Sequence, residues 1–251
     1  LTQLFTQLPI DVVEIDFPYF LDKQNTNQRQ HDFVFVRDLF VSDQNGKIII
    51  SKFSEEARQI EADIMQAMLE SMGYKTIRFP EGSSATAEGG EFYLCPKDKI
   101  LFSGVCRNNL KGAEWVAEEF NIDELVIIKS KAFHLDTLFT PVLNKENRLA
   151  AMIACTSLME TDSVDSLRSL AKRKNIELVE VEPEDAIGTK NELGEFAVNC
   201  QPLPGYLIGP TRFRSNKVAP LLKELKVMHI TVPTTQFRLS GGAIHCLTNE
   251  L

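Results

Sequence analysis

A repeated order of elements constrains the fold of this chain more than any other feature of its sequence. In the first copy, residues 32–41 and 47–51 alternate like strands around a hairpin turn at Asn45-Gly46. Residues 54–73 follow with helical apolar spacing, a capping serine at the start and a glycine at the end. Residues 74–79 then predict a third strand. The unit is therefore a hairpin, a helix and a strand.

Further copies of this unit follow along the chain. Their hairpins are predicted at residues 91–105, 138–154 and 196–208, and their helix and strand pairs at residues 110–128, 162–181 and 218–232. A fifth copy begins at residues 241–248, and we expect an N-terminal strand at residues 12–15 to complete it. Units of about 45 to 65 residues are too long for common solenoids, so they favour a small closed ring of α/β modules. The alternative is an ordinary mixed α/β domain whose hairpins look alike by chance.

Composition narrows the class of protein. The 251 residues are 43% hydrophobic, enough to bury a sizeable core in one large domain or two ordinary ones. The formal net charge is -8 and the basic residues are scattered, whereas a nucleic-acid binder needs a basic footprint. No apolar run approaches the roughly 20 residues that span a bilayer. We therefore expect neither nucleic acid nor membrane as a partner.

The five cysteines are widely spaced and form no CxxC pair, which argues against a zinc site and against a thioredoxin-like motif. We also expect no other metal. An odd number in a chain of this length also argues against a disulfide scaffold and favours a reducing compartment. With no secretory signal, we expect a cytoplasmic protein. Because the chain starts at Leu1 rather than Met, we expect residues to be missing at its ends.

Each predicted unit opens with a polar residue on or beside its first strand. These residues are Asp38, Glu88, His134, Asn199 and Cys246. If the modules form a ring, these positions converge on one central channel. A thiol, an imidazole and carboxylates together are suited to covalent catalysis on a cationic substrate.

Three segments resemble the signature segments of the guanidino-group-modifying enzymes, namely Glu88-Gly-Gly-Glu91, Phe133-His-Leu-Asp-Thr137 and Ser240-Gly-Gly-Ala-Ile-His-Cys246. Residues 35–40 and 106–108 are similar to two further segments, and all five stand in family order. That superfamily includes arginine deiminases, agmatine deiminases, dimethylarginine dimethylaminohydrolases and amidinotransferases. The resemblance covers essentially the whole chain. It implies a five-bladed α/β propeller, the pentein fold, and one catalytic domain over residues 1–251.

The resemblance implies a covalent mechanism. Cys246 would attack the guanidinium carbon, and His134 would protonate the departing nitrogen and then activate the hydrolytic water. A guanidinium cation beside the thiol would itself favour the thiolate. Glu88 would pair with His134 and contact the guanidinium. No organic cofactor is implied, because the nucleophile belongs to the protein.

The resemblance also implies how the substrate is recognised. Asp38 and Asp136 would accept N–H groups of the guanidinium in charge-assisted hydrogen bonds, which are about twice as strong as neutral ones. Without such a cation, three buried carboxylates would be expensive to desolvate. Arg107 and Arg58 would pair with the α-carboxylate of the substrate.

Each of these residues has a structural explanation as well. Cys246 could be a small buried apolar residue, His134 a satisfied core histidine and Glu88 a solvated loop acid, while the two aspartates could be caps. Their places within the matching segments favour function. We expect a structural role for the remaining candidates, which are Asn199, His245, Cys95, Cys106, Cys155 and Cys200.

Two departures from the family pattern bear on the substrate. Glu91 stands where the family usually has aspartate, so the pocket wall could shift by one methylene. Dimethylarginine enzymes usually lack an acid two residues after the histidine, so Asp136 favours an unmethylated guanidinium. We therefore expect an arginine deiminase-like hydrolase that releases citrulline and ammonia.

The alternatives within the superfamily are dimethylarginine hydrolysis, amidino transfer to a second amine, and hydrolysis of a ureido compound such as citrulline. A different class, a non-catalytic binding module, is represented among pentein folds by a ribosome-binding factor. The sequence leaves the oligomeric state open, a homodimer being one possibility.

Overall fold

The computed structural model describes residues 1–15 and 31–251 and contains four three-stranded sheets of the predicted kind. In each sheet an antiparallel hairpin is followed by a helix and then by a strand parallel to the second hairpin strand. A parallel pair needs a long crossover, which the helix supplies. The strands are β1 (Phe40–Ser42), β2 (Ile48–Ile50), β3 (Thr76–Ile77), β4 (Phe92–Cys95), β5 (Ile100–Gly104), β6 (Glu124–Ile128), β7 (Phe139–Leu143), β8 (Leu149–Ala154), β9 (Glu177–Glu180), β10 (Gln201–Leu203), β11 (Tyr206–Gly209) and β12 (Met228–Thr231).

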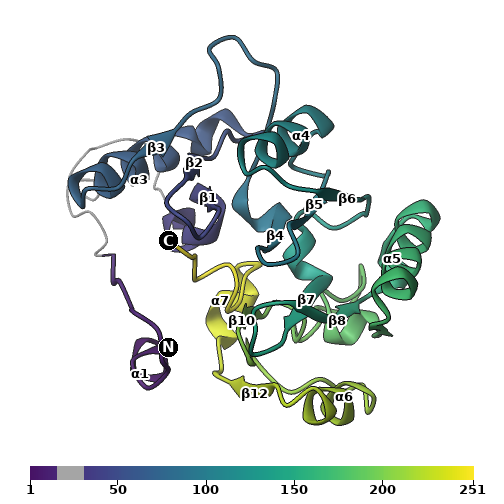
Figure 1. The fold of residues 1–251 in the computed structure, drawn as a ribbon. Helices are drawn as coiled ribbons and strands as arrows, with labels where there is room; N and C mark the ends of the chain where they lie inside the picture. The colour runs from purple at the N-terminus through teal and green to yellow at the C-terminus, as the bar shows by residue number, and fades with distance from the viewer. Residues whose placement is uncertain (16–30) are drawn as a thin grey trace.

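The helices that connect each hairpin to its third strand lie at the periphery of the molecule, and the first strands of the sheets lie towards its centre (Figure 1). The connecting helices are α3 (Gln59–Ser71), α4 (Leu110–Glu119), α5 (Thr161–Lys174) and α6 (Val218–Glu224), and two short helices near the chain ends are α1 (Thr2–Phe5) and α7 (Thr235–Leu239). Strand β4 contacts β7, and β7 contacts β10. Neighbouring modules thus meet through their innermost strands, and the residues just before those strands come together.

Local sequence explains where the helices begin and end. Asn109 caps α4 by accepting a hydrogen bond from the backbone N–H of Gly112. Helix α5 buries Val164, Leu167, Leu170 and Ala171 at helical spacing, and Asn175 ends it in the left-handed conformation.

The core lies between the sheets and their covering helices. Strands β5 and β7 are buried along their whole length, as expected of strands covered on both faces. The largest apolar cluster joins the second, third and fourth modules, and a smaller one fills the first. The second, third and fourth modules therefore share one core, and the first module has a separate cluster of its own.

Three strand predictions are wrong. Much of residues 32–41 forms two 3₁₀ turns, His31–Val34 and Val36–Leu39, ahead of a short β1. The strand expected at residues 196–200 lies instead at Gln201–Leu203, because Phe196 has a positive φ of 56° that a strand cannot contain.

The third wrong prediction concerns the fifth module. Residues 12–15 and 241–248 are described, and neither segment contains a strand. The second segment is a series of tight turns, in which the backbone N–H of Leu247 binds the carbonyls of Ala243 and Ile244 and Gly241 has a φ of +92°. The described part of the chain therefore has four sheets, and no closed five-bladed ring is seen.

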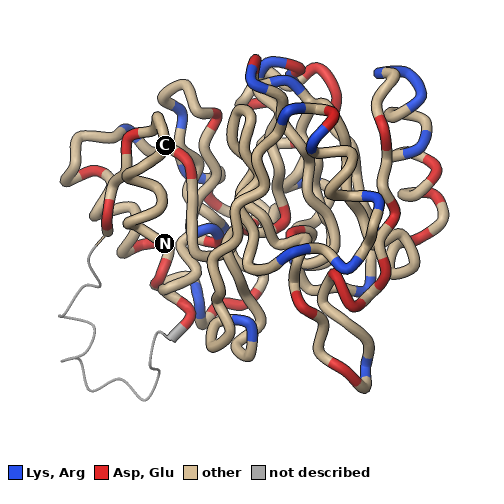
Figure 2. The backbone as a smooth tube through the Cα atoms, turned by 90° about the horizontal axis from the view of Figure 1, so that it is seen from below, with Lys and Arg blue, Asp and Glu red and all other residues tan. Residues whose placement is uncertain are grey.

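Positions of Lys and Arg are interspersed with positions of Asp and Glu along the described chain in the view of Figure 2. In residues 1–15 and 31–251, no helix is both long and apolar enough to cross a bilayer.

Glu91 joins the second and third modules. Its buried carboxyl accepts backbone N–H groups from Cys106 at 3.0 Å, Arg107 at 2.7 Å and Leu135 at 2.8 Å. Burial raises the pKa of this carboxyl, against the lowering effect of the nearby imidazole of His134 and of these hydrogen bonds. The side chain thus serves as a clamp between modules and is not among the residues that line the central cavity.

We predict that Glu91→Ala lowers the free energy of unfolding by roughly 3 kcal/mol, because it leaves buried N–H groups without their acceptor. The exposed Glu118 on helix α4 gives a matched control, and Glu118→Ala should change the free energy by less than about 0.5 kcal/mol. Denaturant unfolding of both variants measures the difference. Equal changes in the free energy of unfolding for the two variants would contradict the role of Glu91 as a clamp between modules.

Candidate active site

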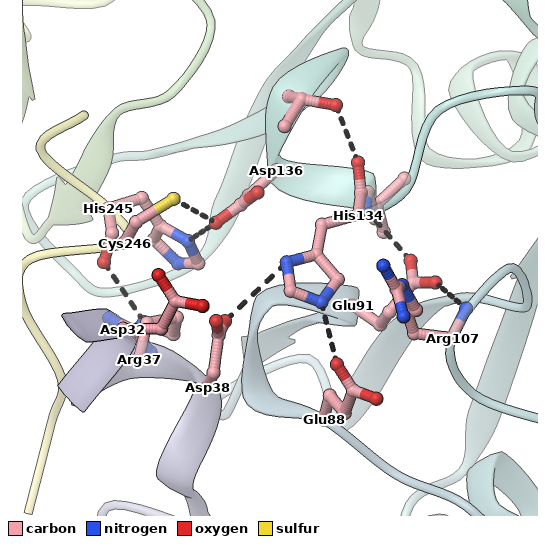
Figure 3. A network of polar contacts seen from close by, with 12 residues as sticks. Asp32, Arg37, Asp38, Glu88, Glu91, Arg107, His134, Asp136, His245 and Cys246 are labelled. Carbon is pink, nitrogen blue, oxygen red and sulfur yellow. Dashed lines mark hydrogen bonds and ion pairs between the residues drawn. The ribbon is translucent and has the colours of Figure 1, made fainter. Parts of the chain in front are cut away.

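A central cavity of about 130 Å³ brings the predicted catalytic residues to one place. Its lining includes Asp38, Glu88, His134 and Cys246, which come from four different modules or segments of the chain. Figure 3 shows Asp38 and Glu88 pointing toward the ring of His134, and the sulfur of Cys246 pointing toward Asp136. The convergence expected from the ring arrangement is therefore present without a fifth sheet.

Cys246 lies in the turns that follow α7. Its buried thiol donates a hydrogen bond to Oδ2 of Asp136 at 3.3 Å and accepts one from Nδ2 of Asn199 at 3.2 Å. Its backbone carbonyl accepts the N–H of Arg37, which ties the turn to the first module. Burial, together with the charges of Asp136 and Asp38, raises the pKa of the thiol well above its usual range.

His134 lies between two acids. Its Nε2 is 3.0 Å from Oε2 of Glu88, and its Nδ1 is 3.5 Å from Oδ1 of Asp38. Burial by itself would lower the pKa of this imidazole, but Asp38, Glu88 and further acids outweigh burial and raise it to about 10. His134 is therefore a protonated acid at neutral pH. The close approach requires Gly90, because a Cβ there would lie 2.7 Å from both Asp38 Oδ1 and His134 Nδ1.

Glu88 is fixed from both sides. Its Oε1 accepts hydrogen bonds from the backbone N–H and the hydroxyl of Ser54 at 2.9 and 2.8 Å, and its own N–H donates to Asn108. Burial would raise the pKa of this carboxyl, but the bond and charge of His134 and the bonds from Ser54 lower it. Glu88 thus stays ionised and holds the imidazolium.

Asp136 is completely buried, and its Oδ2 also receives Nδ1 of His245 at 2.9 Å. Burial raises the pKa of Asp136 to about 7, although the nearby imidazolium of His134 acts to lower it. Its second oxygen, Oδ1, has no hydrogen-bonding partner within the described residues.

Asp38 has a similar arrangement. Its Oδ2 accepts a hydrogen bond from Nη1 of Arg58 at 2.9 Å, while Oδ1 is buried and has no hydrogen-bonding partner in residues 1–15 and 31–251. Arg58 also binds Glu61 at 2.9 Å and is largely buried. Arg58 thus lines the cavity and is paired with two acids, and its contact with the carboxylate of a ligand stays a prediction.

Arg107 lines the mouth of the cavity and forms an ion pair with Glu55. Both side chains are partly exposed, and Asp32 lines the same cavity. The mouth of the cavity thus places the guanidinium of Arg107 beside the carboxylates of Glu55 and Asp32. This arrangement suits binding of the charged groups of an amino acid.

Sequence reasoning did not foresee the contacts of Asn199 and His245. Asn199 holds the turn through Oδ1, which accepts the backbone N–H of His245 at 3.0 Å, and Nδ2 contacts the sulfur of Cys246. The sequence feature that could have indicated a role for Asn199 at the site is its position at the start of the fourth predicted module. For His245, adjacency to Cys246 gave no indication that its ring reaches Asp136.

A third unforeseen group lies behind the site. Arg37 is buried and donates to Gln201 at 2.7 Å, to Glu250 at 2.5 Å and to the carbonyl of His245 at 3.4 Å. Asn249 donates to the carbonyls of Val36 and Phe40. These contacts anchor the chain on the C-terminal side of Cys246.

Across the described residues, no group of three or more histidine, cysteine, aspartate or glutamate side chains is arranged to hold a metal ion. The protein does supply a thiol, a protonated imidazole and the carboxylates of Asp38 and Glu88 around one cavity. Asp136 is not among the residues that line the cavity, and it reaches the site through its hydrogen bond with the thiol of Cys246. This set can bind a planar cation and attack it.

Comparison with solved structures shows the same fold in proteins of low sequence identity. The N-terminal domain of ArgZ, a mutant bound to substrate and described as an arginine dihydrolase of the ornithine-ammonia cycle in cyanobacteria, has a TM-score of 0.70 at 22% identity over 87% of this chain and 75% of its own. A dimethylarginine dimethylaminohydrolase adduct with 4-chloro-2-hydroxymethylpyridine has a TM-score of 0.63 at 18% identity, over 88% of this chain and 79% of its own.

A mutant of AgrE in a binary complex with L-arginine has a TM-score of 0.72 at 20% identity, over 98% of this chain. This chain spans only 34% of that longer protein. No curated protein matches the chain in sequence.

The family model described as N,N dimethylarginine dimethylhydrolase, eukaryotic, matches residues 14–251, which is nearly the whole chain. The fold and the family therefore confirm the resemblance drawn from the sequence segments. The chain belongs to the eukaryotic N,N dimethylarginine dimethylhydrolase family, among the guanidino-group-modifying enzymes of pentein fold.

Proposed function

We propose that this protein is an arginine deiminase-like hydrolase, which converts free arginine or a close analogue to citrulline and ammonia. The observation that carries the proposal is the pair of buried oxygens, Oδ1 of Asp38 and Oδ1 of Asp136, that lack hydrogen-bonding partners within the described residues beside Cys246 and His134. An unpartnered buried carboxylate oxygen is costly, and a guanidinium supplies both the charge and the N–H donors that relieve this cost.

The raised pKa of Cys246 supports activation by the substrate itself. In the free protein, burial and two carboxylates keep the sulfur protonated. A bound guanidinium brings a positive charge to the thiol and neutralises the acids that oppose its ionisation. The thiol proton then leaves, through Asp136 or directly to solvent, and the thiolate attacks the central carbon of the guanidinium.

The protonated state of His134 suits the next step. Its imidazolium gives a proton to one terminal nitrogen, the C–N bond breaks, and ammonia leaves a thiouronium cation on Cys246. The imidazole, now neutral, takes a proton from water as the water attacks the same carbon. The C–S bond then breaks, the thiolate is released, and the urea group of citrulline forms as the remaining proton passes to solvent.

Methylated arginine is the second candidate substrate, because the matching family is described by N,N-dimethylarginine. Loss of dimethylamine in place of ammonia follows the same steps. A dimethylated nitrogen carries no N–H, so it cannot satisfy one of the two unpartnered aspartate oxygens. The free oxygen on Asp136 therefore favours the unmethylated compound.

We further propose that residues 1–251 act as one catalytic domain to which both chain ends contribute. Phe5 from the N-terminal segment packs with Ile208 and with Ile244 of the nucleophile turn, which supports this proposal. All five cysteines are free, in keeping with a reducing compartment such as the cytoplasm.

Incubation with arginine should yield citrulline and ammonia in equal amounts. Cys246→Ala should lower the rate more than about 1,000-fold, because it removes the nucleophile. The matched control is Cys95→Ala, at a cysteine buried in the largest apolar cluster away from the cavity, which should retain activity. Dimethylarginine, agmatine and citrulline tested beside arginine rank the candidate substrates. Absence of turnover across all guanidino compounds would refute the proposal.

Arginine binding to Cys246→Ala should weaken as the pH falls through about 7, since protonation of Asp136 removes the charge that pairs with the guanidinium. Titration calorimetry should show the dissociation constant rising up to about tenfold per pH unit below that value. In the double variant that also carries Asp136→Asn, this dependence should disappear. An affinity that is constant or that improves on acidification would contradict the role of Asp136.

The ionised Asp136 should also destabilise the fold. Its carboxyl pKa rises from 3.8 to about 7 on folding, so the cost is absent below about pH 4 and complete above about pH 7. Asp136→Asn should therefore increase the free energy of unfolding by roughly 2–4 kcal/mol at about pH 8, and by much less at about pH 4. Denaturant unfolding at both pH values measures this, with the exposed Asp165→Asn as control. A lower free energy of unfolding for Asp136→Asn than for the unaltered protein at the higher pH would contradict the proposed destabilisation by ionised Asp136.

A further inference from the structure

His245 has no part in the steps above, yet its ring touches a residue on which the proposed function depends. The side chain is 1% exposed, and Nδ1 lies 2.9 Å from Oδ2 of Asp136. The same oxygen accepts the thiol of Cys246 at 3.3 Å (Figure 3). Two donors thus converge on one oxygen of Asp136, and the other oxygen is left without a partner among the described residues.

The protonation state of His245 follows from its surroundings. Burial, with the positive charges of Arg37 and His134, lowers the pKa of His245 well below its usual range. The ring is therefore neutral and carries one N–H. Because an ionised carboxylate only accepts hydrogen bonds, that N–H must be on Nδ1 when Asp136 is charged.

The ring of His245 is also held in place. It stacks on Tyr93, with 4.1 Å between the ring centroids and 28° between the planes. The hydroxyl of Tyr93 donates to the carbonyl of Cys200 at 3.2 Å, and the backbone N–H of His245 donates to Asn199 at 3.0 Å. Rotation of the imidazole away from Asp136 would break the stacking contact inside a closed core.

We propose that His245 is a positioning residue, which binds one oxygen of Asp136 so that the carboxylate is held ionised with its other oxygen free for the guanidinium. This inference rests on the proposed function for the identity of the ligand. Arg58 stands in a similar relation to Asp38, since it binds Oδ2, while Oδ1 accepts no hydrogen bond among the described residues and lies 3.5 Å from Nδ1 of His134. The site would thus present two aspartate oxygens whose orientation is set by donors behind them.

Groups other than His245 also affect the protonation of the Asp136 carboxyl. The charged and titratable groups around it are His134, Asp38, Arg37, Cys246 and Tyr93. All of these remain in a variant of His245 alone, so a change in the titration of Asp136 reports on the lost hydrogen bond.

Two substitutions separate the hydrogen bond from the packing. His245→Phe keeps a ring to stack on Tyr93 and removes the donor, whereas His245→Asn loses the ring and places an amide N–H near the position of Nδ1. Carbon-13 NMR of labelled aspartate carboxyls, with Asp136→Asn to assign the signal, follows the proton on Asp136 without any substrate. We expect the pKa of Asp136 to rise by about one unit in His245→Phe and to stay near the unaltered value in His245→Asn.

The kinetic readout follows from the same shift. Near pH 7, His245→Phe should raise KM for arginine several-fold with a smaller change in kcat, and the difference should shrink as the pH rises. An unchanged pKa of Asp136 in His245→Phe, or equal shifts in both variants, would overturn the positioning role. If the protein turned over no guanidino compound, the proposed function would fail while the NMR titration still decided the role of His245.

Should His245→Phe fail to fold, nitrogen-15 NMR of the unaltered protein gives the answer. The proton of His245 should be on Nδ1 once Asp136 is ionised. A proton found on Nε2 under that condition would overturn the inference.

Discussion

Three buried carboxylates surround one protonated imidazole, and the account of the site depends on this imbalance of charge. Asp38, Glu88 and Asp136 are each at most 3% exposed, and the ring of His134 lies among them with its pKa raised to about 10. One imidazolium cannot neutralise three acids, and Arg58 compensates only Asp38 from behind. The remaining imbalance is visible in the raised pKa of Asp136 and in the two unpartnered oxygens. A fold tolerates such an arrangement when a ligand completes it.

The modular fold explains how these groups meet. The 3₁₀ turns Val36–Leu39, Gly89–Glu91 and Leu135–Thr137 stand ahead of β1, β4 and β7, and consecutive turns contact one another. Each turn places an acid or the imidazole at the centre, while apolar strands and helices bury the rest. Glycines in these turns let the segments approach closely, and a Cβ on Gly89 would lie 1.8 Å from the carbonyl oxygen of Arg37. Catalytic precision therefore comes from contacts between modules rather than from any single loop.

Much of this arrangement could be predicted from the sequence, because hairpins, caps and apolar spacing are local signals. The four helices between hairpin and strand were expected at nearly their observed positions. Of the predicted site residues, Asp38, Arg58, Glu88, Arg107, His134 and Cys246 line the cavity, and Asp136 does not. The clearest failure has a tertiary cause. Residues 32–41 show strand-like alternation, but tertiary contacts decide their conformation, as when Asn249 binds the carbonyls of Val36 and Phe40.

The sequence also did not predict which side chains pair with one another. Arg58 was expected to pair with the carboxylate of a ligand, and the sequence did not predict that it also pairs with Asp38 and Glu61. His245 looked like a neighbour of Cys246, yet its ring turns to Asp136. Both outcomes depend on which acid lies within reach after folding, and one sequence contains no direct signal of that.

The central claim is that a guanidinium cation completes the charge balance and thereby activates Cys246. The most direct measurement is the pH titration of the Cys246 thiolate by ultraviolet absorbance, with Cys246→Ala subtracted, in the absence and presence of guanidinium ion at a concentration too low to unfold the protein. The account predicts that the pKa of the thiol, raised in the free protein, falls when the cation is bound. An identical titration in both conditions, with guanidinium shown to occupy the site, would contradict it.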